Sequence, residues 1–106
     1  MITIRIGSVS RKFESLRDID EGWINQQIQG LHREKHEVCV HVTIDEGRLN
    51  LVLATPACGG AGGGGRPPSA QEQKIFDVWN DEKLNDAEIR GGHLVAFFKR
   101  IRKLID

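Results

Sequence analysis

Residues 38–54, with the sequence VCVHVTIDEGRLNLVLA, decide the fold of this chain. Large aliphatic residues take every second position on both sides of a short polar stretch, a period of two that is typical of strands with one buried face. We expect Glu46 and Gly47 to be the central residues of a tight turn between two strands. The facing pairs would then be Ile44 with Leu49, Val42 with Leu51, and Val40 with Leu53. The stretch therefore predicts a β-hairpin with all its large apolar side chains on one face.

The second face of this predicted hairpin is only partly polar. It carries Cys39, His41, Thr43, Asn50 and Val52. We expect another surface to cover it, such as a second copy of the chain.

The segments that precede the hairpin predict one strand and one helix. Ile2, Ile4 and Ile6 alternate with polar residues and predict a strand over 2–6. Gly7-Ser8 interrupts this pattern, after which the chain either continues the strand or begins a turn. From Asp18 or Asp20, either of which could cap a helix, the period changes to that of a helix ending between Gly30 and Lys35. Its apolar stripe consists of Ile24, Ile28 and Leu31, with Ile19 and Trp23 beside it.

Two further helices are predicted after the hairpin. Ser69 and Glu72 have the spacing of a capping box, in which the serine caps the helix and the glutamate reaches back. The core face of that helix consists of Ile75, Val78 and Trp79, flanked by Phe76. The last segment predicts a strongly amphipathic helix, whose apolar stripe contains Leu94, Phe97, Phe98, Ile101, Leu104 and Ile105.

The order β-α-β-β-α-α predicts an α+β fold over 1–106, a small two-layer domain. Its mostly antiparallel three-stranded sheet would have the helices packed on one face. Such a sheet leaves two edges and one face to protect, and dimerisation protects such surfaces in small proteins. We therefore expect a homodimer.

Composition excludes several classes of protein. The chain has 106 residues, 28% of them charged, with 15 Lys+Arg against 15 Asp+Glu, which is ordinary for one globular domain and unlike a disordered tail. No apolar run approaches the roughly 18 residues of a membrane span, and residues 1–6 lack the apolar core of a signal peptide. Two cysteines are too few for a disulfide scaffold, so we expect a soluble, cytoplasmic protein with reduced thiols.

The zero net charge hides a segregation of charge in the C-terminal third. Residues 71–89 carry six acidic and two basic side chains, and residues 90–106 carry one acidic and five basic. The simplest interpretation is two helices that attract each other along their polar edges.

A glycine-rich loop over 56–68 is the feature that folding alone explains least. Six of the twelve glycines fall within seven positions, and ordering them costs more backbone entropy than ordering other residues. We expect this loop to be the contact surface, with Arg66 as the anchoring polar group. The predicted binding residues are Cys58, Gly59, Gly60, Gly62, Gly63, Gly64, Gly65 and Arg66.

Alternatives to a contact loop remain open at this point. Backbone amides of a glycine-rich loop can surround an anion, but two prolines follow Arg66 where a nucleotide-binding loop has Gly-Lys-Ser/Thr. Cys58 is a candidate nucleophile, with Arg66 to bind an anionic substrate and His41 or His93 as the base beside it. In such a reaction the Cys58 thiolate would be the attacking group, and no other motif in the chain supports an enzyme.

Histidines and basic residues give two further hypotheses. His32, His36, Cys39 and His41 are acceptable zinc ligands by type, but their spacing crosses a helix end and a strand start, so we expect no metal and no cofactor. The last helix carries Lys99, Arg100, Arg102 and Lys103 without interleaved aromatic residues, which makes nucleic acid an unfavoured partner.

The sequence thus favours a small non-enzymatic protein-interaction or adaptor module that uses the glycine-rich loop. An anion- or small-ligand-binding domain using loop amides, Arg66 and a reactive Cys58 is the second interpretation. An accessory nucleic-acid binder acting through the last helix is the third, and a membrane partner is not expected.

Overall fold

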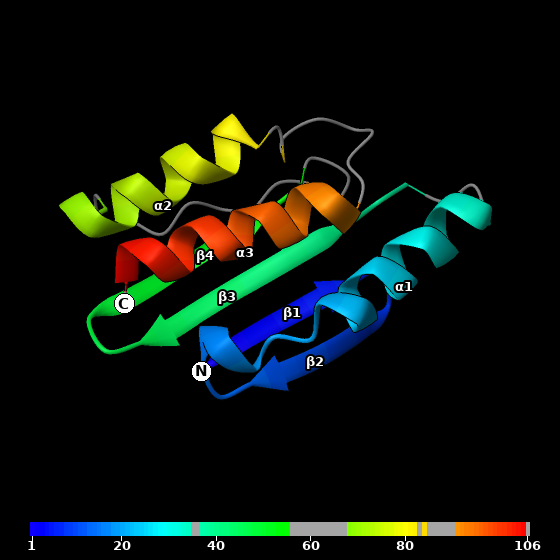
Figure 1. The fold of residues 1–106 in the computed structure, drawn as a ribbon, viewed down its shortest axis with the longest axis horizontal. Coiled ribbons are helices and arrows are strands. Elements are labelled where there is room, and N and C mark those ends of the chain that lie inside the picture. Colours follow the sequence, from blue (N-terminus) through cyan, green and yellow to red (C-terminus); the bar gives the residue numbers. More distant parts are fainter. Residues whose placement is uncertain (35–36, 56–67, 83, 85–90, 106) are drawn as a thin grey trace.

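The computed structural model describes residues 1–34, 37–55, 68–82, 84 and 91–105. They form a small α+β fold with a four-stranded antiparallel sheet and three helices (Figure 1). The elements are β1 (Ile2–Ile6), β2 (Val9–Phe13), the short 3₁₀-helix η1 (Leu16–Asp18), α1 (Glu21–Arg33), β3 (Val40–Glu46), β4 (Leu49–Ala54), α2 (Ala70–Asp81) and α3 (Gly91–Ile105).

The sheet has four strands in the order β2-β1-β3-β4, so the prediction of three strands was wrong. The missed strand is β2, which forms a hairpin with β1 through a turn at Gly7, whose φ is +63°. Four of its five residues are exposed, and Arg11 stands at a position that would be apolar in a half-buried strand. The alternation that marks the other strands is therefore interrupted at Arg11, and pairing with β1 rather than local pattern makes this segment a strand.

The hairpin of β3 and β4 has the predicted faces but a different register. Glu46 pairs with Leu49, so Gly47 and Arg48 are the central turn residues and Ile44 lies opposite Leu51. Gly47 has φ +60° and takes the first central position, where glycine adopts a positive φ without steric cost. The shift of two residues along one strand keeps every apolar side chain on the same face, because side chains alternate with a period of two.

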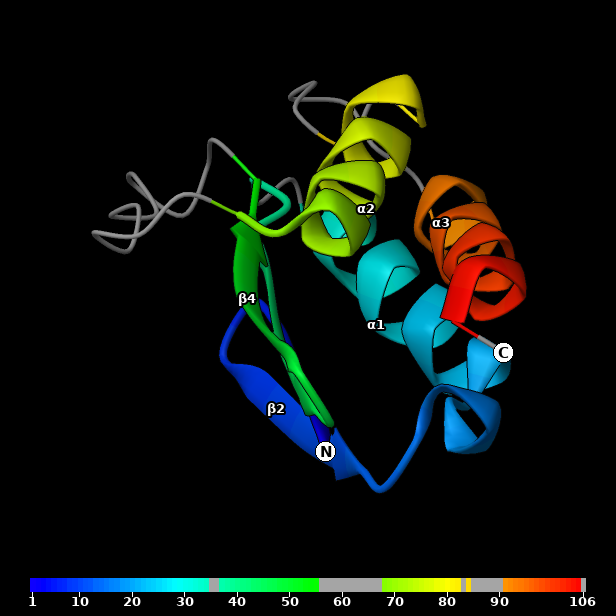
Figure 2. The ribbon, with the colours of Figure 1, turned by 90° about the vertical axis from the view of Figure 1, so that its left-hand side faces the viewer.

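All three helices lie on one side of the sheet, as Figure 2 shows with the sheet nearly edge-on. The core lies between the two layers, where β1 and β3 contribute aliphatic side chains that are at most 2% exposed. From the helices, the fully buried apolar residues are Ile24, Ile28, Ile75, Leu94, Phe97 and Ile101. The two-layer arrangement with helices on one face is confirmed. Leu104 is 41% exposed, so its predicted place in the buried stripe was wrong.

Local capping signals fix the starts of α1 and α2. The Asp20 carboxylate accepts a hydrogen bond from Trp23 N (3.1 Å), which identifies the cap of α1 among the two predicted candidates. Ser69 Oγ accepts from Glu72 N (3.2 Å), and the Glu72 carboxylate accepts from Ser69 N (2.9 Å). The predicted capping box is confirmed.

Two buried polar side chains join elements that lie far apart in sequence. The second carboxylate oxygen of Glu72 accepts from Asn50 N (3.0 Å), which fastens the start of α2 to the outer edge of β4. Thr55 Oγ1 accepts a hydrogen bond from Val40 N (3.0 Å) and donates one to Val38 O (2.9 Å). These two bonds connect the residue after β4 with the start of β3. Neither connection follows from the sequence pattern.

We expect opposite effects from the same substitution at two glycines. Gly47→Ala should lower the free energy of unfolding by roughly 1–2 kcal/mol, because Ala at φ +60° suffers the steric cost of the left-handed region. Gly30→Ala should raise it by roughly 0.5–1 kcal/mol, because Gly30 lies inside α1 and Ala favours the helix. A Cβ at either position meets nothing within 4 Å, so steric clashes with other residues do not contribute to the difference between the two variants. Urea unfolding followed by circular dichroism measures both, and a loss of stability at Gly30 would contradict the prediction.

Candidate functional site

No helix in the described part covers the face of the sheet turned away from α1, α2 and α3 (Figure 2). We call it the open face. It contains the side chains whose positions alternate with those of the core: Thr3 and Arg5 of β1, Ser10 and Lys12 of β2, Cys39 just before β3, His41, Thr43 and Asp45 of β3, and Asn50, Val52 and Ala54 of β4.

Two rows of directly opposed residues cross the open face. The first row is Lys12, Thr3, Thr43 and Val52, and the second is Ser10, Arg5, His41 and Ala54. Opposed residues in an antiparallel sheet have Cβ atoms about 5 Å apart, and diagonal neighbours are about 7 Å apart. Arg5 and Lys12 are diagonal neighbours, so two cations and an imidazole lie close together among hydroxyl groups.

The open face was predicted in part. Cys39, His41, Thr43, Asn50 and Val52 do lie on the face opposite the core, with Val52 42% exposed. Thr3 and Arg5 were not assigned to that face, because the sequence leaves open the place of the predicted strand 2–6 in the sheet. Ser10 and Lys12 were missed because β2 was not predicted. Ser10 and Lys12 alternate with Val9, Arg11 and Phe13, and this weak alternation is the only signal that could have found them.

The cations of β2 have different surroundings on the two faces. Arg11 points to the helix side, where Nη1 lies 3.4 Å from an oxygen of Asp20 and the guanidinium lies over the rings of Phe13 (5.1 Å) and Trp23 (5.8 Å). Lys12 and Arg5 point to the open face and are both exposed. Within the described ranges, neither forms an ion pair with a carboxylate; Arg5 Nη2 makes one long contact of 4.0 Å with Cys39 Sγ.

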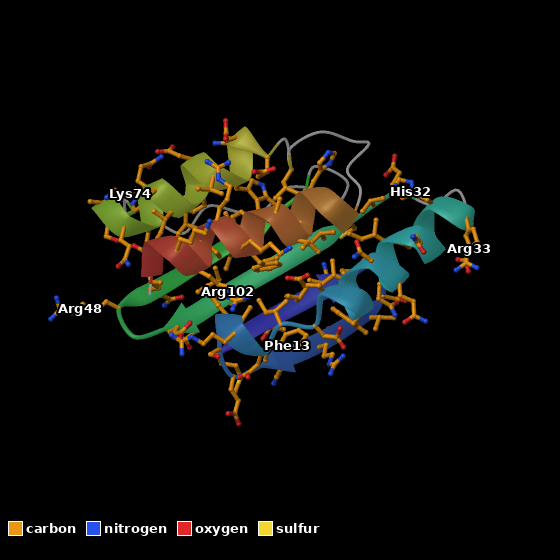
Figure 3. The ribbon with its side chains drawn as sticks, viewed as in Figure 1. Phe13, His32, Arg33, Arg48, Lys74 and Arg102 are labelled. Atoms are coloured by element: carbon orange, nitrogen blue, oxygen red, sulfur yellow. The ribbon has the colours of Figure 1, made fainter. Side chains whose placement is uncertain are left out.

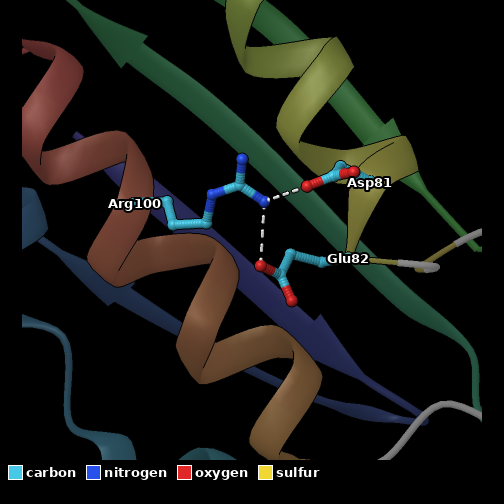
Figure 4. Close-up of polar contacts among 3 residues, drawn as sticks. All are labelled: Asp81, Glu82 and Arg100. Atoms are coloured by element: carbon cyan, nitrogen blue, oxygen red, sulfur yellow. Dashed lines mark hydrogen bonds and ion pairs between the residues drawn. The ribbon is translucent and has the colours of Figure 1, made fainter.

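Two of the four basic residues of α3 lie within ion-pair distance of carboxylates of the other helices. Arg100 Nη1 lies 2.5 Å from Asp81 Oδ2 and 2.9 Å from Glu82 Oε1 at the end of α2 (Figure 4). These hydrogen bonds, first that to Asp81 and then that to Glu82, raise the pKa of Arg100. Lys99 Nζ lies 3.8 Å from Glu21 Oε2 of α1. The predicted attraction between the acidic and basic C-terminal segments is confirmed.

The glycine-rich binding loop predicted from the sequence cannot be placed. Cys58, Gly59, Gly60, Gly62, Gly63, Gly64, Gly65 and Arg66 all lie outside the described residues. The same holds for His36 of the hypothetical zinc site.

Cys39 is disulfide-bonded, which differs from the expectation of reduced thiols. Its backbone carbonyl accepts a hydrogen bond from Gly7 N (2.8 Å) and thereby continues the pairing of β1 with β3 by one residue. The sequence has one other cysteine, Cys58.

The three histidines that the structure describes lie in different elements. His32 lies near the C-terminal end of α1, far from the β3–β4 turn that carries Arg48, as Figure 3 shows. His41 lies on the open face, and His93 lies in the first turn of α3. In the ranges that the structure describes, no group of three or more His, Cys, Asp or Glu side chains could hold a metal ion. Nor is any described helix long and apolar enough to cross a membrane.

Comparisons with protein-family models, with curated protein sequences and with solved structures found no match.

Proposed function

We propose that this chain is a small non-enzymatic protein-interaction module that contacts its partner through the open face. One observation carries the proposal: three helices cover one face of the four-stranded sheet, and the described residues leave the other face to solvent. That face combines a partly exposed apolar residue, Val52, with hydroxyls, cations and an imidazole. Protein-binding surfaces are about as apolar as the rest of a protein surface and are enriched in arginine, so this face is compatible with protein binding through Arg5 and Val52.

The glycine-rich segment 56–68 belongs to the same proposal as a second contact surface. It follows β4 directly in the sequence, and β4 supplies Val52 and Ala54 to the open face. Arg66 is its anchoring polar group. The alternative in which its backbone amides bind an anion is weaker, because two prolines follow Arg66 and remove two N–H donors. The alternative in which Cys58 reacts as a thiolate is weaker, because that chemistry needs reduced cysteines and Cys39 is disulfide-bonded.

A nucleic-acid binder acting through α3 is the less favoured function. Two of the four basic residues that suggested it, Lys99 and Arg100, are within ion-pair distance of carboxylates of the same chain. Binding to phosphate would require these pairs to open or to share their cations.

Matched substitutions at two valines test the proposed function. Val52 and Val9 are both 42% exposed, but only Val52 lies on the open face. Val52→Asp should abolish capture of partner proteins by the tagged chain from an extract of its source cells, whereas Val9→Asp should leave it unchanged. Capture is measured by quantitative mass spectrometry, with circular dichroism to verify that both variants fold. An unchanged set of captured proteins with Val52→Asp would overturn the proposal.

The same purified proteins test the predicted homodimer. Light scattering should give twice the chain mass of 11.9 kDa if a second copy is a partner. The outer edge of β2 is a candidate surface for that contact, because β2 pairs with one strand only and the edge of β4 is fastened to Glu72.

A further inference from the structure

The charges of the open face separate along the strands. Arg5 and His41 oppose each other in neighbouring strands, with Lys12 diagonal to Arg5. Among the strand residues of this face the carboxylate is Asp45, four residues from His41 along β3, or about 13 Å. Another carboxylate, Glu14, follows Lys12 by two residues just beyond the end of β2. One end of the open face is therefore basic, although the chain as a whole is neutral.

The cations of this basic end differ from the cations that form ion pairs within the chain. Arg11, Lys99 and Arg100 each lie within 4.0 Å of a carboxylate of another element. Arg5 and Lys12 have no such carboxylate in the described ranges, although both are exposed and point to the same side. Their positive charges are thus available for an external anion.

We propose that the basic end of the open face binds an acidic polypeptide segment, with Arg5 and Lys12 donating to its carboxylates. The proposal rests on the proposed function and specifies the chemistry of its partner. In an extended peptide, alternate side chains point to the same side about 7 Å apart, which is close to the diagonal spacing of Arg5 and Lys12. The hydroxyls of Ser10, Thr3 and Thr43 surround the two cations and can donate further hydrogen bonds.

A polypeptide fits this surface better than a nucleic acid. All six aromatic residues of the chain belong to the core or pack against it: Phe13, Trp23, Phe76, Trp79, Phe97 and Phe98. The open face therefore has no Phe, Tyr or Trp ring on which bases could stack, and its planar side chains are His41 and Arg5. Two lysine or arginine residues would also release few counterions, since each phosphate contact contributes a salt slope of only about 0.9.

A second copy of the chain fits the open face less well than an acidic peptide does. Two open faces in direct contact would bring the basic ends of both sheets into one interface, together with the desolvation cost of four cations. Like charges that face each other across an interface suppress association.

Binding of a defined acidic peptide tests the proposal. The probe is a fluorescein-labelled peptide of alternating Glu and Thr, and fluorescence anisotropy measures its affinity for the full chain. Arg5→Ala and Lys12→Ala should each weaken binding by about three- to tenfold, because each removes one charge-assisted contact. Arg5→Lys should weaken it less than Arg5→Ala. Lys103→Ala removes an exposed cation of α3 and should change the affinity less than twofold.

Several results would overturn it. One is an affinity for a peptide of alternating Gln and Thr that equals the affinity for the acidic peptide. Another is a loss of affinity with Lys103→Ala as large as that with Arg5→Ala. A third is tighter binding of an oligothymidine of the same length than of the acidic peptide. A dimer in light scattering that dissociates on Arg5→Ala would assign the face to a second copy instead. If Val52→Asp abolishes partner capture while the acidic peptide does not bind, the proposed function stands and this inference fails.

Discussion

Glu72→Ala should lower the free energy of unfolding by about 2–3 kcal/mol, a large effect for a residue near a helix start. The Glu72 side chain is 1% exposed, and its two oxygens accept hydrogen bonds from Ser69 N and Asn50 N. Alanine would leave both donors without a protein acceptor. The loss exceeds that of an ordinary capping residue, because one carboxylate serves the helix start and a strand edge together. Part of it is offset because a buried carboxylate no longer has to be desolvated.

Two control variants separate the causes of this loss. Gln71→Ala, an exposed neighbour in the same helical turn, should change stability by less than about 0.5 kcal/mol. Glu72→Gln keeps one acceptor oxygen but turns an amide group toward the other N–H, so it should lie between wild type and alanine. Urea unfolding measures the free energy of unfolding of Glu72→Ala, Gln71→Ala and Glu72→Gln. A loss below about 0.5 kcal/mol for Glu72→Ala would show that solvent satisfies both donors.

The hydrogen bond between Asn50 N and Glu72 also affects the tendency of the chain to aggregate. Asn50 N lies on the outer edge of β4, and an edge strand with free N–H groups can pair with another chain. We expect Glu72→Ala to aggregate faster than Gln71→Ala at equal concentration. Turbidity measured below the unfolding temperature follows this difference.

Gly91→Ala should lower the free energy of unfolding by about 1–3 kcal/mol, because α1 and α3 approach each other too closely for a side chain there. A Cβ at Gly91 would overlap Asn25 Oδ1 and lie 3.0 Å from Asn25 Cα. The Asn25 side chain can rotate away, but the backbone of α1 can withdraw only if the two helices separate. Helix separation disturbs the packing of Leu94, which is fully buried one turn further along α3.

The neighbouring glycine supplies the control for this prediction. A Cβ at Gly92 meets nothing within 4 Å, so Gly92→Ala should be neutral or stabilise by up to about 1 kcal/mol through helix propensity. Asn25→Ala combined with Gly91→Ala should recover part of the loss, since it removes the contacts with Asn25 Oδ1 and Cγ and leaves that with the Cα of residue 25. Thermal unfolding of wild type, Gly91→Ala, Asn25→Ala and the double variant measures the coupling of the two positions, with Gly92→Ala as the control. Equal stabilities of Gly91→Ala and Gly92→Ala would contradict the close approach.

Local signals in the sequence predicted the helices well. Asp20 caps α1, and Ser69 with Glu72 caps α2 as the spacing required. Each signal involves residues three positions apart, which interact as soon as the helix turn forms and need no tertiary contact. The amphipathic pattern of α3 likewise predicted the burial of Phe97.

The candidate site was less predictable, because its residues come from three separate segments. His41 and Thr43 were assigned to the correct face from their own strand alone. Arg5 and Lys12 were not recognised, because their proximity depends on β2 pairing with β1 and β1 pairing with β3. The availability of their charges also depends on packing, which brings carboxylates to Arg11 and Arg100 but not to these two.

The sequence by itself determined which side chains of 38–54 face the core, because alternation along a strand is a property of the local backbone. It also determined the class of the fold and the attraction between the charged C-terminal segments. Only the tertiary structure decided the strand order β2-β1-β3-β4, the register at Gly47 and the approach of Gly91 to Asn25. These features depend on contacts between residues far apart in the chain, and the free energy of such contacts exists only once the elements pack together.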